Sequence, residues 1–472
     1  MLTKIKTPFF LGTLLFIGLF FFLPHVDTDF GWHLRYGEHF LQTKTVLRTN
    51  ELTYYLAGYL WPNSYTLYQI IITTIYKISG FLGISIAYSA LMVSTYIVYN
   101  KLNPKLIRVN LITFIFIIIF GFSVFASGFR AQIFTFVFLV STLYLLKYFF
   151  DKKYLPIIFV LIYILWANLH GGFILGLILI ASAFINAVLS NNKRGAFLFG
   201  ISFVFSTLAS LINPYGIKIF LEDIRHMQVP MGTLIAEWVA PSFFYKLIIV
   251  ISSLIILFQI WKIKSKKIYF WTFLVTGLSY ITLLANRNLP FYAMVTLQAA
   301  YEVFHKRLLI FENNLTIKTL TNILLLSGIG ITALVNIPKT LTAANNPEYI
   351  CRNGILPTPC KAVEFIKKSE IPGKNVFSSY EWGGFLAWKL PEYKFFVDGR
   401  TPAWPTPDGK SPYTVYLEII QAQKGYQESL DKYGTDWMLV PANTFLDLEL
   451  QTNQTVWKEI YRDEISVVYV KT

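Results

Sequence analysis

Long apolar segments dominate this chain of 472 residues and constrain its fold more than any other feature. A helix that spans a membrane needs about 20 mostly apolar residues. Segments of roughly that kind fall at 8–24, 65–79, 82–99, 110–127, 131–150, 154–168, 172–190, 196–212, 244–261, 268–285, 290–304 and 318–336. Only 14% of the residues are charged, whereas a soluble protein carries roughly a quarter. The sequence therefore predicts an α-helical polytopic membrane protein over residues 1–339 and, where hydropathy drops, a soluble α/β domain over residues 340–472.

Lysine and arginine residues between the apolar segments predict the orientation, because cytoplasmic loops carry an excess of both. Basic residues occur near the N-terminus and at 101–108, 147–153, 193–194, 262–267 and 306–307. If all of these are cytoplasmic, the connections near 130, 170, 213–243 and 287 lie outside, and the C-terminal domain is extracytoplasmic. The chain can then cross the membrane only once between residues 65 and 99, although this region holds two apolar segments separated by "KISGFLG". One of the two segments would therefore be re-entrant, broken or interfacial. We expect about 11 transmembrane helices, with 12 as the alternative.

The formal net charge of +15 comes largely from those short clusters. The expected partner of the basic residues is therefore a lipid bilayer and not nucleic acid. The two cysteines, Cys351 and Cys360, form no metal-binding motif. A disulfide between them and two free thiols both remain open.

The C-terminal domain alternates strand and helix patterns, which favours a largely parallel sheet. Helices are expected at 360–370, 382–390 and 413–434, and strands at 375–379, 394–400, 437–442 and 465–470. Parallel sheets place sites at the ends of strands. Tyr380 and Trp382 follow the first strand, and Asp398 and Arg400 end the second. These four are candidates for substrate binding; a tight strand–helix turn and a buried Asp–Arg pair are the alternative.

The first outside loop, 25–64, begins with "DTDFGWHLR" directly after an apolar run. Asp27 and Asp29 at i, i+2 can converge on a hard divalent cation, Mg²⁺ or Mn²⁺, or one of them can act as a base. The alternative is that Asp29 caps a helix and Asp27 is a loop residue. Trp32, Tyr36 and Phe40 would form the aromatic stripe of that helix, which is expected to lie in the membrane interface.

Further polar side chains are predicted at the same membrane face as this acidic pair. A charged group at membrane depth is costly, and it usually faces a cavity or a partner. Each of these side chains, taken singly, also has a purely structural interpretation, such as an arginine that reaches lipid headgroups or a hydrogen-bonded core histidine. The candidates for substrate binding are His33, Arg35, Arg130, Asn168, His170, Glu237 and Arg287.

An Asp-x-Asp pair in the first outside loop, immediately after the first helix, resembles the integral-membrane glycosyltransferases of the GT-C superfamily. These include protein O-mannosyltransferases, aminoarabinose transferases and the catalytic subunits of oligosaccharyltransferases. "YEWGG" is loosely similar to the oligosaccharyltransferase motif "WWDYG", although the order of acidic and aromatic residues differs. "DTDFGWHLRYGE", "WANLHGGFILG", "INPYG", "IAEW" and "YEWGGFLAW…FFVDGR" also look like a group of mostly uncharacterised bacterial membrane proteins placed near that superfamily.

The resemblance implies an inverting glycosyltransferase in the bacterial inner membrane. It would move a sugar from a polyprenyl-phosphate donor to an extracytoplasmic glycan, lipid or protein. Asp27 matches the catalytic first-loop acid of the family, and Asp29 completes the pair. The alternative from another class is a non-catalytic transporter or flippase of lipid-linked glycans, or a glycan-binding scaffold.

Overall fold

The structure is a computed structural model, and it describes residues 7–229, 231–233, 235–346, 348–349, 351, 356–406, 409–452 and 455–472. The chain forms two compact units. The first, here called the helical unit, comprises Met1–His25, Phe81–Ile217 and Ile235–Leu341. The second, here called the sheet unit, comprises Val26–Gly80, Lys218–Leu234 and Thr342–Thr472. The sequence predicts a domain boundary near residue 339. The sheet unit, however, also includes most of the first outside loop and residues 218–234.

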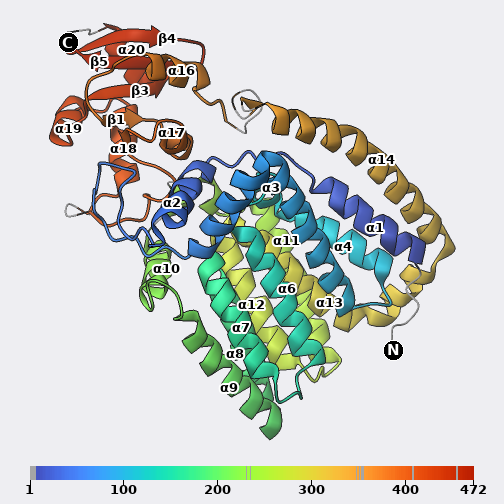
Figure 1. Cartoon of the computed structure of the whole chain (residues 1–472). Coiled ribbons are helices and arrows are strands. Elements are labelled where there is room, and N and C mark those ends of the chain that lie inside the picture. Colours follow the sequence, from blue (N-terminus) through green and yellow to red (C-terminus); the bar gives the residue numbers. More distant parts are fainter. Residues whose placement is uncertain are drawn as a thin grey trace. The chain divides into compact units, whose positions relative to one another are not determined.

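The helical unit is built from apolar helices. They are α1 (Thr7–Phe20), the second part of α3 (Thr66–Leu102), α4 (Ile107–Phe120), α5 (Phe122–Phe125), α6 (Gln132–Tyr148), α7 (Leu155–Leu169), α8 (Phe173–Leu189), α9 (Lys193–Ser210), α11 (Phe243–Lys262), α12 (Ile268–Leu284), α13 (Leu289–Asn313) and most of α14 (Leu315–Asn345). Two short 3₁₀ turns, η2 (Ala236–Trp238) and η3 (Asn286–Asn288), precede α11 and α13. Figure 1 shows α6, α7 and α8 side by side, and α9 packs on both α7 and α8.

Within the described part of the chain, three helices are long and apolar enough to cross a membrane: Thr66–Leu102, Ala236–Lys262 and Leu315–Asn345. Shorter apolar helices of 10–17 residues accompany them. Large apolar side chains such as Phe243 (82% exposed) and Leu334 (79% exposed) lie on the surface, as expected of a surface that faces lipid. The membrane character predicted from hydropathy is supported, and the number of about 11 spans remains a prediction.

The two apolar segments at 65–79 and 82–99 form the two parts of α3, which is interrupted at Gly80. Gly80 has φ 59° and ψ −153°, a conformation that favours glycine. A break was one of the three expectations for this region, and the glycine of "KISGFLG" is where it occurs.

The sheet unit contains a five-stranded sheet in the order β2-β1-β3-β5-β4. Its strands are β1 (Asn375–Ser378), β2 (Lys394–Phe395), β3 (Trp437–Pro441), β4 (Trp457–Arg462) and β5 (Ser466–Lys471). β1 is parallel to β2 and β3, while β3–β5 and β4–β5 are antiparallel. The prediction of a largely parallel sheet is therefore wrong for half of it, because residues 457–462 form an unpredicted strand that pairs with β5.

The helices of the sheet unit are α2 (Phe30–Thr43), the first part of α3, α10 (Lys218–Gln228), α16 (Cys360–Lys368), α17 (Gly383–Lys389), α18 (Pro412–Ile420), α19 (Tyr426–Lys432) and α20 (Phe445–Thr452), with the 3₁₀ turns η1 (Met231–Thr233) and η4 (Tyr380–Trp382). The expected helix 413–434 is two helices, since Ala422 and Gly425 adopt positive φ between them.

The first outside loop is attached to the edge of the sheet. Thr53 forms a parallel bridge with Phe395, and the N–H of Tyr54 donates to the Phe395 carbonyl at 3.0 Å. α10 is attached to the same loop, since Arg225 donates to the Tyr59 hydroxyl. These contacts make the loop part of the folded unit.

Candidate functional site

Three sequence motifs meet in the sheet unit because glycines remove the side chains that would keep them apart. A Cβ on Gly31 of α2 would lie 1.8 Å from the Gly384 carbonyl oxygen of α17. A Cβ on Gly399 would lie 2.0 Å from Oδ1 of Asp29. Real Cβ atoms do not approach so closely, so only glycine permits this packing. "DTDFG", "YEWGG" and "FFVDGR" are thus held together.

A small hollow of about 20 Å³ lies beside "DTDFG" and "YEWGG", with room for about one water molecule. The carboxylates of Asp27 and Glu381 are on its lining, together with aromatic side chains that include Trp382 and Trp388. The segment Leu356–Thr358 forms another part of the wall. The walls of the hollow therefore combine acidic and apolar residues.

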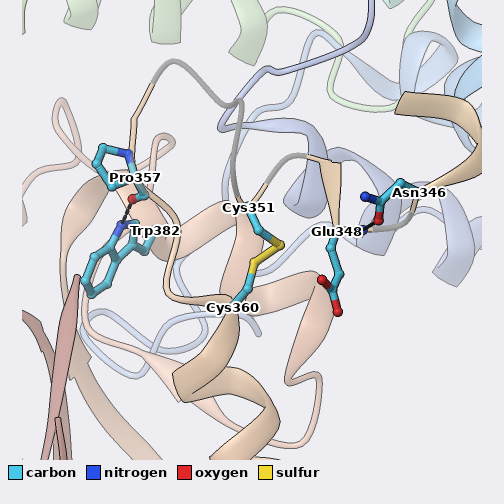
Figure 2. The surroundings of a disulfide bond; sticks show 6 residues. All are labelled: Asn346, Glu348, Cys351, Pro357, Cys360 and Trp382. Carbon is cyan, nitrogen blue, oxygen red and sulfur yellow. Dashed lines mark hydrogen bonds between the residues drawn. A yellow bond between two sulfur atoms is a disulfide. The ribbon is translucent and has the colours of Figure 1, made fainter. Parts of the chain in front are cut away.

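A disulfide holds the chain next to this wall. Cys351 and Cys360 are bonded with their Cα atoms 5.7 Å apart, which decides between the two alternatives left open by the sequence. Figure 2 shows the bond beside Pro357, whose carbonyl oxygen accepts from the indole N–H of Trp382 at 2.8 Å. Both links tie residues 356–358 to the sheet unit.

The acidic pair lies at the start of α2. Asp27 is 8% exposed, and its Oδ1 accepts from the Asp29 N–H at 3.4 Å. Asp29 occupies the N-cap position but its side chain makes no cap hydrogen bond. Its Oδ1 accepts instead from Nε1 of Trp32 at 3.0 Å. The alternative of a side-chain cap is therefore wrong for Asp29.

α2 does not expose its aromatic stripe. Trp32 (4% exposed) and Tyr36 (3% exposed) pack with Trp61 and Trp404 in a buried cluster. The expectation of an interfacial helix with these aromatics toward lipid is wrong for Trp32 and Tyr36, because Trp61 of the same loop and Trp404 cover that face.

His33 and Arg35 differ in their surroundings. The ring of His33 is 4% exposed and lies edge-to-face with Tyr68 at 4.7 Å between centroids. Arg35 is partly exposed and forms an ion pair with Glu38 at 3.2 Å. Of the two side chains, that of Arg35 is the more accessible.

Asp398 and Arg400 form a buried ion pair with side chains 1% and 0% exposed. Nε of Arg400 donates to both carboxylate oxygens of Asp398, at 2.9 and 3.0 Å. The guanidinium also donates to the Tyr36 hydroxyl at 2.6 Å and to Oδ1 of Asn50 at 3.2 Å. Burial raises the pKa of Tyr36 to about 12, so its hydroxyl stays protonated at neutral pH. The pair connects the C-terminal strands to the first outside loop.

Tyr380 and Trp382 flank Glu381 in η4. The Tyr380 ring packs edge-to-face on Tyr413, with centroids 4.5 Å apart. Burial, together with the negative charges of Asp29 and other acidic neighbours, raises the pKa of Tyr380 well above its usual range. Glu381 accepts from the Ser379 hydroxyl.

A second cluster of predicted residues lies in the helical unit. Arg130 donates to Oε1 of Glu237 at 2.9 Å, and the two side chains are 12% and 27% exposed. The Arg287 guanidinium lies over the ring of Trp238, 4.3 Å from its centroid. The N–H of Asn286 donates to the Val239 carbonyl at 2.9 Å, which joins η2 to η3. The structure therefore brings Arg130, Glu237 and Arg287 together.

His170, in the connection between α7 and α8, belongs to the same cluster. Its Nδ1 accepts from the Gly172 N–H at 2.9 Å and lies 2.8 Å from Oγ1 of Thr135. Because Nδ1 accepts, the neutral ring carries its proton on Nε2. Burial, and then the positive charges of Arg287 and Arg130, lower the pKa of His170 to about 3.

Asn168 is tied to neighbouring backbone. Its side-chain amide donates to the carbonyls of Ile164 and Ile212, each at 2.8 Å. These bonds join the end of α7 to the end of α9.

The donor set for a divalent cation is small. Within the described residues, no group of three or more His, Cys, Asp or Glu side chains could hold a metal ion. Asp27 and Asp29 offer two carboxylates, which suits a cation such as Mg²⁺ that takes one or two carboxylates and completes its shell with substrate phosphate and water. The residues fit such a cation only together with a substrate.

Two residues near these clusters were not among the predicted site residues. Glu381 lines the hollow with Asp27, and its place inside "YEWGG" was a visible signal. His25 is buried, and burial and then the charge of Arg130 lower its pKa to about 3. Its position two residues before Asp27 was the signal there.

No protein-family model matches the chain, and no curated protein matches it either. Solved structures of the oligosaccharyltransferase of Archaeoglobus fulgidus do. The structure tethered with an acceptor peptide containing the NVT sequon has a TM-score of 0.58 at 12% identity and covers 99% of this chain and 74% of that chain. The AglB complex with an inhibitory peptide and a dolichol-phosphate has a TM-score of 0.58 at 12% identity and covers 100% and 75%. The complex with Zn and sulfate has a TM-score of 0.53 at 13% identity and covers 97% and 73%.

This similarity extends over nearly the whole chain and establishes the fold. The resemblance to the GT-C membrane glycosyltransferases that the sequence motifs indicate is confirmed at that level.

Proposed function

We propose that the chain is an integral-membrane glycosyltransferase that moves a sugar from a polyprenyl-phosphate donor to an extracytoplasmic acceptor. The observation that carries the proposal is the packing of the Asp-x-Asp pair against "YEWGG" and "FFVDGR" beside a hollow, in a fold shared with an oligosaccharyltransferase. The dolichol-phosphate bound to the archaeal neighbour agrees with a lipid-linked donor.

The cationic cluster of the helical unit is assigned to the donor phosphate. Arg130 and Arg287 each carry a permanent charge, and Arg130 is already paired with Glu237. A phosphate would compete with that carboxylate for the guanidinium through charge-assisted hydrogen bonds. His170 stays neutral and can donate through Nε2. Arg35 of the sheet unit is also assigned to substrate binding. Asn168 holds the backbone on which His170 lies.

Asp27 is assigned to the acceptor. The acceptor oxygen attacks the anomeric carbon, its proton passes to a carboxylate oxygen of Asp27, and the bond from that carbon to the phosphate oxygen breaks. The lipid phosphate leaves with the electron pair, and the configuration at the anomeric carbon inverts. If Asp27 and Asp29 instead hold Mg²⁺ or Mn²⁺, the cation would supply charge stabilisation for the leaving phosphate. General-base help contributes about 10²- to 10⁴-fold in rate.

The remaining predicted residues are assigned to the acceptor side and its support. Trp382 would contact the acceptor at the hollow, where Glu381 also lies. Tyr380 would support this turn through its contact with Tyr413. Asp398 and Arg400 are assigned an indirect role. Their buried pair binds Tyr36 and Asn50 of the first outside loop, which also carries Asp29. His33 supports α2 within its aromatic surroundings.

The disulfide supports the proposed location of the sheet unit. Disulfides persist in oxidising compartments and are rare in the cytosol. The Cys351–Cys360 bond therefore agrees with the orientation inferred from lysine and arginine, with the C-terminal residues at the outer face of a bacterial inner membrane.

Release of polyprenyl phosphate from labelled polyprenyl-phosphate sugars tests the assignment. Full-length protein and the variants Asp27→Asn and Asp29→Asn are compared with Glu464→Gln, a matched change of an exposed carboxylate in the same unit. We expect the two aspartate variants to lose at least about 100-fold in rate and the control to lose none.

Equal rates in wild type and both aspartate variants would contradict the assigned chemistry. If no sugar is transferred and the labelled lipid instead crosses vesicle membranes in a protein-dependent manner, the flippase alternative is favoured.

A further inference from the structure

A groove runs along α7 and α9 in the helical unit, away from the residues assigned above. Its volume is about 650 Å³, within the range of ligand sites. Apolar side chains line most of it, including Ile157 and Val160 of α7 and Phe197, Ile201 and Phe205 of α9. Ile157 is 64% exposed and Phe197 is 66% exposed, so the described residues of the helical unit leave this surface open.

One end of the groove is basic. Lys153 and Arg194 are part of its lining, and the adjacent Lys152 and Lys193 add to the positive charge. At this end, Nη2 of Arg194 donates to the Asp151 carbonyl oxygen at 2.8 Å, and the carboxylate of Asp151 lies 3.9 Å from Nζ of Lys152. Both α7 and α9 begin here, so the positive ends of their dipoles add to the attraction for an anion.

The dimensions of the groove match one leaflet of a bilayer. From Arg194 to Phe205 the helix advances 11 residues, or about 16 Å at about 1.5 Å per residue. Half of a hydrocarbon core of roughly 30 Å is about 15 Å. An acyl chain that lies along Ile201 and Phe205 would therefore end near the bilayer midplane while its headgroup reaches Lys153 and Arg194.

We propose that this groove binds an anionic glycerophospholipid of the cytoplasmic leaflet. The phosphate and any further anionic headgroup oxygens contact Lys153 and Arg194, and an acyl chain packs against Val160, Phe197 and Ile201. Basic pockets between transmembrane helices on the cytoplasmic side are typical sites for anionic headgroups. The site is distinct from the proposed transfer chemistry, because the basic residues that define it belong to the clusters expected on the cytoplasmic side.

Native mass spectrometry of the detergent-solubilised full-length protein tests the proposal with added phosphatidylglycerol and phosphatidylcholine. The variant Lys153→Gln/Arg194→Gln removes the basic end of the groove. The control Lys264→Gln/Lys266→Gln removes the same charge from another cytoplasmic cluster. A third variant, Ile201→Trp, fills the apolar part and leaves the charges in place.

We expect wild type to bind phosphatidylglycerol at least tenfold more tightly than phosphatidylcholine. Each charge removed from the groove should weaken phosphatidylglycerol binding about fivefold, so the double variant loses roughly 25-fold, while the control loses less than twofold. Ile201→Trp should weaken the binding of both lipids.

Three results would overturn the proposal. They are equal affinity for the two lipids, an equal loss in the Lys264/Lys266 control, and unchanged binding in Ile201→Trp. A dimer mass that Ile201→Trp abolishes in the absence of lipid would show that a second copy of the chain occupies the groove instead.

Discussion

Arg400→Met should destabilise the sheet unit more than any loss of a surface ion pair. Both Arg400 and its partner Asp398 are at most 1% exposed, so removal of the guanidinium leaves a carboxylate buried without its cation. Breaking a buried pair in this way costs about 3–5 kcal/mol. The Tyr36 hydroxyl also loses its 2.6 Å contact with the guanidinium, which adds about 1 kcal/mol. We expect a total loss of roughly 4–6 kcal/mol, a large part of the 5–15 kcal/mol by which proteins are usually stable.

Urea unfolding of the full-length protein in detergent, followed by tryptophan fluorescence, measures this loss. Trp61 and Trp404 each lie with their ring centroid 5.4 Å from the Arg400 guanidinium, so they report on this cluster directly. Lys410→Met is the matched control, because the Lys410–Glu418 pair is also close, at 2.7 Å, but its side chains are 52% and 31% exposed. Its loss should cost at most about 1 kcal/mol.

A double variant separates burial of an unpaired charge from loss of packing. Asp398→Leu/Arg400→Met removes both charges, and apolar replacement of a buried pair is often neutral or stabilising. We expect it to be more stable than Arg400→Met alone. The reasoning fails if Arg400→Met costs no more than Lys410→Met, or if the double variant is less stable than the single one.

Three further predictions concern close packing, pH and the disulfide. Gly31→Ala should lower the free energy of unfolding by about 3 kcal/mol in the same assay, because its Cβ would lie 1.8 Å from the Gly384 carbonyl oxygen. The control Gly277→Ala places no atom within 4 Å of the new Cβ, so it should be neutral or stabilising. The pKa of His170 is lowered from 6.5 to about 3, so the unfolded state takes up a proton before the folded state does on acidification. Stability should therefore fall by about 1.4 kcal/mol per pH unit between pH 6.5 and 3. A thermal-unfolding series over this pH range should show a smaller fall in His170→Gln. Cys360→Ser should lower the stability of the sheet unit by about 2–3 kcal/mol, and a reductant should reproduce that loss in wild type and leave the variant unchanged.

Much of the candidate site could be predicted from short motifs. The spacing of the Asp-x-Asp pair and its place after the first apolar run identify it. Arg130, His170 and Arg287 are identified as polar residues in tight connections between apolar segments. The structure places Asp27 on a hollow and pairs Arg130 with Glu237. Such residues are conspicuous because charge is costly near a membrane.

The surroundings of those residues could not be predicted. Trp32 and Tyr36 have the spacing of an interfacial helix, yet they are buried, since periodicity shows which side chains share a face and not what covers that face. The unpredicted strand β4 has an exposed and charged pattern, "WKEIYR", typical of an edge strand, and it is recognisable only once β5 lies beside it.

The sequence by itself determined the membrane character, most of the helices and the acidic motif, because each depends on residues that are neighbours along the chain. It left the break near Gly80 as one of three alternatives. Only the tertiary structure decided that the first outside loop folds with the C-terminal residues. That association rests on Gly31 against Gly384 and on Arg400 donating to Tyr36 and Asn50, contacts between residues about 350 positions apart. Glycine and a buried arginine carry no local signal of their partners, since close backbone approach and charge pairing depend on where two segments lie in space.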